Sequence, residues 1–256
     1  MTKLLLIDAT NIGHRLFHGH DDRPLAERFG FALDRWRRVC DPDIALAVFD
    51  APGETWRHEL WLTYKAKRSD DPSTRPSASD WAAIKGECRA AGLRCAWAPN
   101  TEADDLIGSY TAAAQREEVA VDIVTSDKDL WQLVRASPSS VRVIDPGKGS
   151  VADSAAVLER WGVRPDQLAD LLALAGDSSD NYPGLPEIGP KLAARLLAKY
   201  GTLDNLLSDA ALVPGKLSAV LRAGSAQARL FRRLSGLVLE LPLPVPLADL
   251  GWRRRW

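Results

Sequence analysis

The sequence predicts an α/β protein with a parallel sheet in its first part and only helices in its second part. Up to about residue 164, short apolar runs alternate with stretches of helical periodicity, which is the pattern of a parallel α/β sheet. From about residue 165 the pattern changes to consecutive helices without strands. We therefore expect an α/β domain over residues 1–164 and a helical domain over residues 165–256.

The predicted strands are short, mainly apolar runs, as expected where helices cover both faces of a sheet. They are Lys3–Asp8, Ile44–Asp50, Leu93–Trp97, Val119–Thr125 and Val141–Ile144. A helix over Leu25–Cys40 joins the first two strands. Ligands of such sheets lie at the carboxyl ends of the strands, so the residues that follow each run are candidates for a functional site.

The composition is that of an ordinary globular protein, with 26% charged and 46% hydrophobic residues in 256. A net charge of −1 gives no sign of a basic coat for nucleic acid, unless acids gathered in one pocket mask basic patches elsewhere. The sequence shows neither a membrane span nor a signal peptide, and Cys40, Cys88 and Cys95 lack paired metal spacing. We therefore expect a protein of the reducing cytoplasm.

Acidic residues gather at the predicted carboxyl edge of the sheet. They end or follow strands, or open the helix after Asn100, and are Asp8, Asp50, Glu102, Asp104, Asp105, Asp127 and Asp129. Glu102 and Asp105 share a helix face, and Asp127 and Asp129 point to one side of a strand end. Two unit charges about 4 Å apart repel by roughly 4 kcal/mol at an effective dielectric constant of about 20, so the group needs a cation. Ligands that are all oxygen select Mg²⁺ or Mn²⁺.

Each acidic group alone also has an ordinary structural explanation. Aspartate and glutamate cap helix N-termini, and aspartate is common in turns. Asp8, Asp50 and Asp127, however, all follow strands at one edge of the predicted sheet. Capping alone does not readily explain that repetition, and a metal site does.

A basic and aromatic segment lies between residues 54 and 100. Its candidate residues are Arg57, Tyr64, Lys65, Lys67 and Arg68. One explanation is a solvated surface helix followed by a flexible loop. The other is an element that grips phosphates beside the acidic edge, where mobile cations steer a nucleic-acid strand toward the metals.

The helical part carries two more acids, Asp177 and Asp180, and a glycine-rich turn over Gly184–Lys191. The predicted helices on either side are Asp166–Ala175 and Leu192–Tyr200. Gly189 allows close backbone approach, and Lys191 lies at a helix N-terminus, which favours anions. Two helices joined in this way can hold a nucleic-acid backbone without reading its sequence, although helical hairpins also serve simple packing.

The last part of the chain, from Ala211, is the least informative. Three prolines between residues 242 and 246 predict an extended return segment. The basic tail Arg253–Trp256 is of a kind that is more often solvated than functional.

Seven segments of the chain, taken in order, resemble the bacterial 5′ nuclease family, which comprises the 5′–3′ exonuclease domain of DNA polymerase I and its flap-endonuclease relatives. They are LLLIDATN, AVFDA, WRHELWLTYKAKR, EADDLIG, TSDKDLWQL, GDSSDNYPG and IGPK, between Leu4 and about Leu207. Any one segment is a weak signal, and the ordered set is a specific one. No polymerase segment follows, so we expect a stand-alone form.

The resemblance implies a PIN-like parallel sheet with flanking helices and a C-terminal helical domain with a helix-hairpin (H3TH) DNA-binding element. The first implied metal set is Asp8, Asp50, Glu102 and Asp104. The second, bound directly or through waters, is Asp105, Asp127, Asp129, Asp177 and Asp180. Lys65 and Arg68 are implied to face the scissile phosphate in an arch or clamp over about 54–100. The implied DNA contacts are Arg57, Tyr64, Lys67, Gly184, Ile188, Gly189 and Lys191, with K⁺ at the hairpin.

Two features depart from the family pattern. The hairpin usually has glycine where Glu187 stands, which restricts the backbone and places a negative charge near a phosphate path. The segment over residues 69–80 is longer and more acidic than usual, which bears on the geometry of the arch.

The implied activity is two-metal hydrolysis of DNA phosphodiesters, as a 5′–3′ exonuclease and 5′-flap endonuclease in replication and repair. One ion lowers the pKa of a water and the other stabilises the leaving oxygen, about 4 Å away. We expect a monomer near the nucleoid, acting on DNA with a 5′ flap or a 5′ end next to duplex. The alternatives are a PIN-like ribonuclease, which would lack the hairpin, and a catalytically silent protein that binds branched DNA.

Overall fold

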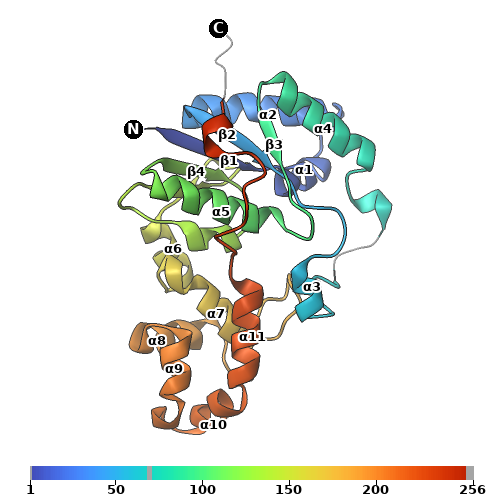
Figure 1. Cartoon of the computed structure of the whole chain (residues 1–256). Coiled ribbons are helices and arrows are strands. Elements are labelled where there is room, and N and C mark those ends of the chain that lie inside the picture. The colour runs from blue at the N-terminus through green and yellow to red at the C-terminus, as the bar shows by residue number, and fades with distance from the viewer. Residues whose placement is uncertain (1, 68–70, 252–256) are drawn as a thin grey trace. The chain divides into compact units, whose positions relative to one another are not determined.

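The computed structural model describes residues 2–67 and 71–251 and divides into two compact units (Figure 1). Unit 1 comprises Met1–Thr55, Ser69–Asp153 and Leu237–Trp256, and unit 2 comprises Trp56–Arg68 and Ser154–Gly236. Neither unit is continuous in sequence. The units do not divide the chain at residue 164, because Trp56–Arg68 belongs to unit 2 and Leu237–Trp256 belongs to unit 1. The domain boundary predicted at residue 164 therefore stays a prediction.

Unit 1 is built on a six-stranded sheet in the order β3-β2-β1-β4-β5-β6. The strands are β1 Lys3–Asp8, β2 Ile44–Val48, β3 Arg94–Ala96, β4 Ala120–Val124, β5 Val141–Ile144 and β6 Val151–Ala152. Neighbouring strands pair in parallel, except for β6, which returns antiparallel to β5. The predicted parallel α/β sheet is confirmed, and the short β6 is an addition to it.

Helices of unit 1 pack on this sheet. They are α1 Ala9–Phe17, α2 Leu25–Cys40, α4 Ala78–Ala90 and α5 Ala103–Arg116, with the 3₁₀ helices η1 Pro72–Thr74, η2 Asp129–Leu133 and η5 Leu247–Asp249. The bounds of α2 are those predicted from the sequence. Its buried residues, Leu25, Phe29, Leu33, Trp36 and Cys40, recur every three or four positions and form one apolar stripe in the core.

The regular elements among the described residues of unit 2 are helices, joined by loops. Its helices are α3 Trp56–Leu60, α6 Ser154–Trp161, η3 Pro165–Gln167, α7 Leu168–Ala175, α8 Pro190–Tyr200, α9 Leu203–Ser208, η4 Ala210–Leu212, α10 Lys216–Ala223 and α11 Ser225–Ser235. The sequence pattern indicated α7 and α8. It did not indicate α10 and α11, which lie in the uninformative region after Ala211. The extended return predicted around residues 242–246 lies in a stretch that contains neither helix nor strand over residues 237–246.

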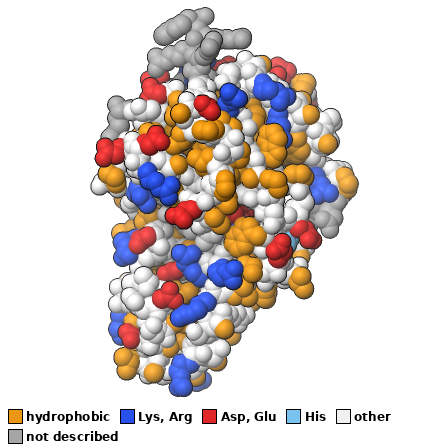
Figure 2. All heavy atoms as spheres, in the orientation of Figure 1, with side chains coloured by type: hydrophobic (Ala, Val, Ile, Leu, Met, Phe, Trp, Pro, Cys, Tyr) orange, Lys and Arg blue, Asp and Glu red, His pale blue; other side chains and the backbone are white. Residues whose placement is uncertain are grey.

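The described part of the chain, residues 2–67 and 71–251, has no helix that could span a membrane, and the face drawn in Figure 2 carries charges of both signs. On the face drawn in Figure 2, acidic, basic and apolar side chains are interspersed. That mixture agrees with the net charge of −1.

Parallel register brings the strand ends of unit 1 to one edge. Asp8 is level with Val48 of β2, and Ile7 is level with Val124 of β4. Asp50 therefore follows β2, and Asp127 follows β4, at the edge where β1 ends in Asp8.

Candidate metal centre and nucleic-acid interface

Asp8 is a buried carboxylate of the acidic edge, with 2% of its surface exposed. It ends β1 and caps α1, where one carboxylate oxygen accepts the N–H of Asn11 at 3.1 Å. The other oxygen accepts the hydroxyl of Thr125, which follows β4, at 2.7 Å. Asp8 thus joins two central strands and the start of a helix.

The pKa of Asp8 is raised to about 7, mainly because burial disfavours its charged form. The negative charges of Asp50 and Asp127 raise it further, against the lowering effect of the hydrogen bonds from Thr125 and Asn11. The three carboxylates therefore lie within electrostatic reach of one another. A bound cation would relieve their repulsion, so the donor set fits a hard divalent metal.

Asp50 connects the loop after β2 to the start of α5. Its own N–H donates to Thr10 Oγ1 at 2.8 Å, and its carboxylate accepts the N–H of Ala103, the first residue of α5, at 2.7 Å. Glu102, the residue before α5, is 6% exposed, and Asp104 lies in the first turn of α5. This link brings the acidic helix start to the edge where Asp50 lies.

Asp105 is completely buried in α5. Its carboxylate accepts the N–H of Val238 at 3.0 Å, in the segment that returns to unit 1. That contact gives Asp105 a role in packing the return segment. Its role as a metal ligand stays a prediction.

Asp127 and Asp129 lie in a turn and a 3₁₀ helix, so the predicted strand-end geometry is wrong for this pair. The N–H of Asp127 donates to Thr125 Oγ1, and the N–H of Asp129 donates to Asp127 Oδ1, both at 2.9 Å. Lys128 Nζ lies 3.6 Å from Asp129 Oδ1. A backbone-to-side-chain turn therefore fixes both acids, where sheet alternation was expected.

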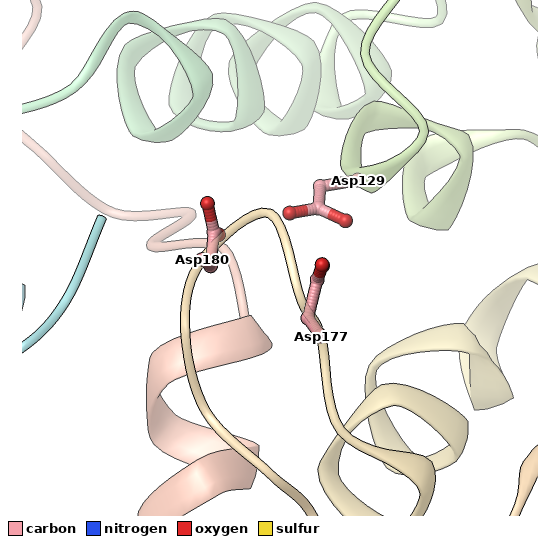
Figure 3. A group of neighbouring side chains, drawn as sticks. All are labelled: Asp129, Asp177 and Asp180. Carbon is pink, nitrogen blue, oxygen red and sulfur yellow. The ribbon is translucent and has the colours of Figure 1, made fainter. Parts of the chain in front are cut away.

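In unit 2, Asp177 and Asp180 occupy the loop after α7 (Figure 3). Both are buried, and each offers a carboxylate oxygen within 4.8 Å of one from the other. Asp177 pairs with Tyr182 through two backbone hydrogen bonds and accepts the N–H and the hydroxyl of Ser179. The short loop thus holds two acids close together, as a cation site requires.

The basic segment packs on this loop within unit 2. Tyr64 is buried and its hydroxyl donates to Asp180 Oδ2 at 3.1 Å, while the N–H of Lys65 donates to the backbone oxygen of Asp180. Lys65 adopts a φ of 54° and places its ammonium group 4.8 Å from the centre of the Tyr64 ring. Lys67 is exposed, and Arg68 lies outside the described residues.

Arg57 occupies a packing position in unit 2. It is 2% exposed, donates to the backbone oxygens of Leu234 and Gly236 at 2.8 and 2.9 Å, and stacks on Trp56. Two carbonyl groups at the end of α11 therefore depend on its guanidinium. The DNA contact predicted for Arg57 stays a prediction.

The hairpin residues form a compact turn before α8. Gly184 has a φ of 70°, and a side chain there would collide with the backbone of Gly176. Ile188 is buried, Gly189 caps α8, and Lys191 is exposed in the first turn of α8. The turn thus presents a helix N-terminus with a lysine, as an anion site needs.

Two polar residues of the acidic edge, Asn11 and Thr125, were not among the sequence candidates. Asn11 Oδ1 accepts the N–H and the hydroxyl of Ser126 at 3.0 and 2.7 Å, and Thr125 bonds Asp8. Thr125 directly follows β4, and Asn11 lies three residues after the end of β1, in the first turn of α1. A polar residue within a few positions of a strand end was the signal that could have identified them.

Each of the two parts of the chain matches a known protein family. Residues 3–162 match the family described as "5'-3' exonuclease, N-terminal resolvase-like domain", and residues 163–255 match "5'-3' exonuclease, C-terminal SAM fold". DNA polymerase I of Rhizobium leguminosarum is 36% identical over 95% of this chain, and the thermostable DNA polymerase I of Thermus thermophilus is 35% identical over 98%. The alignments cover 25% and 30% of those relatives, so the chain spans under a third of their length.

Solved structures show the same fold at lower identity. T5 5′-exonuclease with bound zinc has a TM-score of 0.80 and 19% identity, covering 92% of this chain and 90% of that one. The catalytic core of Rad2 in complex with DNA substrate has a TM-score of 0.61 and 15% identity, covering 98% and 82%. Since the two family matches together span nearly the whole sequence, the chain belongs to the 5′–3′ exonuclease family.

Proposed function

We propose that the protein is a metal-dependent 5′ nuclease that hydrolyses DNA phosphodiesters as a 5′–3′ exonuclease and 5′-flap endonuclease. The observation that carries the proposal is the convergence of Asp8, Asp50 and Asp127 at one sheet edge, where mutual repulsion helps to raise the pKa of Asp8 to about 7. Carboxylates that lie so close together repel one another, and a bound cation would remove this unfavourable energy. Membership of the 5′–3′ exonuclease family supports hydrolysis of phosphodiesters as the reaction.

The proposed first metal set is Asp8, Asp50, Glu102 and Asp104. The proposed second set is Asp105, Asp127, Asp129, Asp177 and Asp180. Bound Mg²⁺ or Mn²⁺ would activate a water and stabilise charge on the leaving oxygen. Support for the second set is that each unit separately presents a buried acidic loop, with Asp129 in one and the Asp177–Asp180 pair in the other.

The remaining residues are proposed to position the DNA. Lys65 and Arg68 are the candidates for stabilising charge on the scissile phosphate. Arg57, Tyr64, Lys67, Gly184, Ile188, Gly189 and Lys191 are the proposed DNA contacts. Because amides and a helix N-terminus bind phosphate, the hairpin would hold duplex DNA without reading its sequence, with K⁺ at the turn. We propose that the protein acts as a monomer on DNA in the cytoplasm.

The test is cleavage of a labelled duplex with a 5′ flap, with and without Mg²⁺. We expect cleavage with Mg²⁺ that leaves 5′-phosphate products, and its loss in Asp127→Ala with DNA binding preserved. Asp209→Ala, a change at an exposed acid that follows α9, is the matched control and should cleave normally. Binding without cleavage in any divalent ion would instead identify a silent binder of branched DNA, and cleavage of RNA alone a ribonuclease.

A further inference from the structure

A group of cations lies on unit 1 outside the proposed metal sets and the proposed DNA contacts. It consists of Arg15 on α1, Arg35 on α2 and Lys148 in the loop after β5, and we call it the β5-loop cluster. All three side chains are exposed. Lys148 is more than a hundred residues from Arg15 and Arg35 in sequence, so only the fold brings it to them.

The cluster is held in a fixed shape. Asp145 Oδ1 accepts the N–H groups of Gly147 and Lys148 at 2.8 and 2.7 Å, which closes the loop on itself. Arg35 donates to the backbone oxygens of Pro146 and Gly147 at 3.4 and 3.3 Å. The guanidinium of Arg15 packs against Gly147 so closely that a Cβ at this position would collide with it. The loop is thus clamped between α1 and α2.

The charges of the cluster do not cancel within it. Burial alone would raise the pKa of Asp145, but the N–H groups of Lys148 and Gly147 and the charges of Arg15 and Lys148 lower it overall, so Asp145 is ionised. It is one carboxylate among three cations. The acceptors that Arg35 contacts in the loop are neutral carbonyls, which do not compensate its charge.

The cluster lies at the same edge of the sheet as the acidic site. Ile144, the last residue of β5, is level with Val124, so the loop leaves the sheet where Asp127 does. On α1, Asp8 is the cap, Asn11 binds Ser126, and Arg15 follows one turn later on the same face. Seven residues at about 1.5 Å each place Arg15 roughly 10 Å along the helix from Asp8.

This spacing matches a nucleic-acid strand that passes the acidic edge. Phosphates of one strand recur about every 3.4 Å along the axis of a duplex, so about 10 Å corresponds to some three nucleotides. We propose that the β5-loop cluster of Arg15, Arg35 and Lys148 binds the phosphate backbone about three nucleotides from the phosphate that is cleaved. This inference rests on the proposed nuclease function. It adds a positioning surface that offsets the repulsion between DNA and the acidic edge.

The test measures the salt dependence of DNA binding in EDTA, by fluorescence anisotropy of a labelled 5′-flap duplex. Each phosphate contact contributes about 0.9 to the slope of log K against log[salt]. Arg15→Gln and Lys148→Gln should each lower the slope by about 0.9 and weaken binding about 8-fold at 0.1 M salt. The single-turnover cleavage rate at saturating enzyme should stay within about 2-fold of wild type, because neither group touches the reacting atoms.

Arg116→Gln is the matched control. Arg116 is also an exposed arginine of unit 1, with 64% of its side chain accessible, but it lies at the far end of the 14-residue α5, about 21 Å from the acidic helix start. The slope of log K against log[salt] for Arg116→Gln should equal that of wild type. An unchanged slope in the Arg15→Gln/Lys148→Gln double variant would overturn the inference and leave the nuclease proposal standing. A wild type that binds DNA but never cleaves it would overturn only the nuclease proposal.

Discussion

At the scale of single residues, Asp8 shows how position changes the chemistry of an ordinary side chain. An aspartate with the usual pKa of 3.8 becomes, at the end of β1, a group with a pKa of about 7. Burial has the largest effect, and the charges of Asp50 and Asp127 add to it. Such a carboxyl is protonated in mild acid and ready to exchange its proton for a metal near neutral pH.

This pKa predicts how the stability of the metal-free protein depends on pH. The folded state holds the Asp8 proton up to about pH 7 and the unfolded chain loses it near pH 4, so stability should fall as pH rises between those values. The expected loss is on the order of a few kcal/mol. Urea unfolding in EDTA at pH 5, 6, 7 and 8 measures it.

Asp8→Asn is the control for this effect, because it keeps an oxygen that can cap α1 and removes the titration. Its stability should change much less between pH 5 and pH 8 than that of wild type. If both proteins lose the same free energy of unfolding over this range, another group is responsible.

Arg57 gives a second prediction at this scale. Arg57→Met should destabilise the protein by about 3 kcal/mol, because the carbonyl groups of Leu234 and Gly236 lose a charged donor in a buried place. The salt slope of DNA binding separates this packing role from the proposed DNA contact: it should fall by about 0.9 in Arg57→Met where the guanidinium meets a phosphate, and stay unchanged where this buried group only packs. Urea unfolding and anisotropy measure the two effects.

Lys67→Met is the comparison, since Lys67 is exposed in the same segment. It should leave stability unchanged and lower the salt slope by about 0.9 if Lys67 meets a phosphate. A lower slope in Arg57→Met would instead support the DNA contact predicted for Arg57.

At the scale of elements, the turn before α8 contains a residue, Glu187, whose backbone conformation favours glycine and whose side chain is negatively charged. Glu187 adopts a φ of 65°, in the left-handed region that favours glycine. Glu187→Gly should stabilise the protein by about 1 kcal/mol and tighten DNA binding, because it removes strain and a negative charge beside the α8 N-terminus. Thermal unfolding and anisotropy measure these two gains.

Glu187→Gln separates the two causes. It removes the charge and keeps the strained backbone, so it should tighten DNA binding without raising the melting temperature. Equal melting temperatures for Glu187→Gly and wild type would show that the left-handed conformation costs nothing here.

Elements with a strong local signal could be predicted from the sequence, and the others could not. The apolar run of β1 and the regular stripe of α2 identified both elements because each spans several buried positions. The two residues of β6 are too few to carry a pattern. In α10 only Leu221 is buried, so its periodicity gives little evidence of a packed face.

The same reasoning applies to the site. Aspartates after apolar strands were visible in the sequence because parallel strands share one edge. The partner of Asp105, the N–H of Val238, is 133 residues away and has no local signature. The turn that fixes Asp127 and Asp129 depends on Thr125, whose hydroxyl can be assigned only once the backbone path is known.

At the scale of the whole molecule, each unit carries carboxylates of the proposed metal sets, and each can be followed by itself. Metal binding should raise the stability of the acidic loops in both units. Hydrogen exchange in the peptides around Asp8 in unit 1 and around Asp177 in unit 2 should slow when Mg²⁺ is added, by up to about 100-fold at 100 times the Kd. Mass spectrometry of the exchanged peptides measures this protection.

Asp177→Ala should lose the metal-dependent protection around residue 177 and keep that around Asp8, which belongs to the proposed first set. A matching change at Asp204, an exposed acid of unit 2, should lose neither. Full metal-dependent protection around residue 177 in Asp177→Ala would contradict a metal-binding role of this acid.

The return segment after Gly236 has a consequence for biosynthesis. Val238 supplies the partner of the buried Asp105, and Val245 exchanges hydrogen bonds with the hydroxyl of Tyr110, so α5 acquires these partners from residues made more than 130 positions later. A ribosome adding about 5–20 residues per second needs roughly 6 to 26 seconds for that stretch. During this interval the nascent sheet domain lacks the hydrogen bonds that tie α5 to the return segment, and a holding chaperone can bind it in that period.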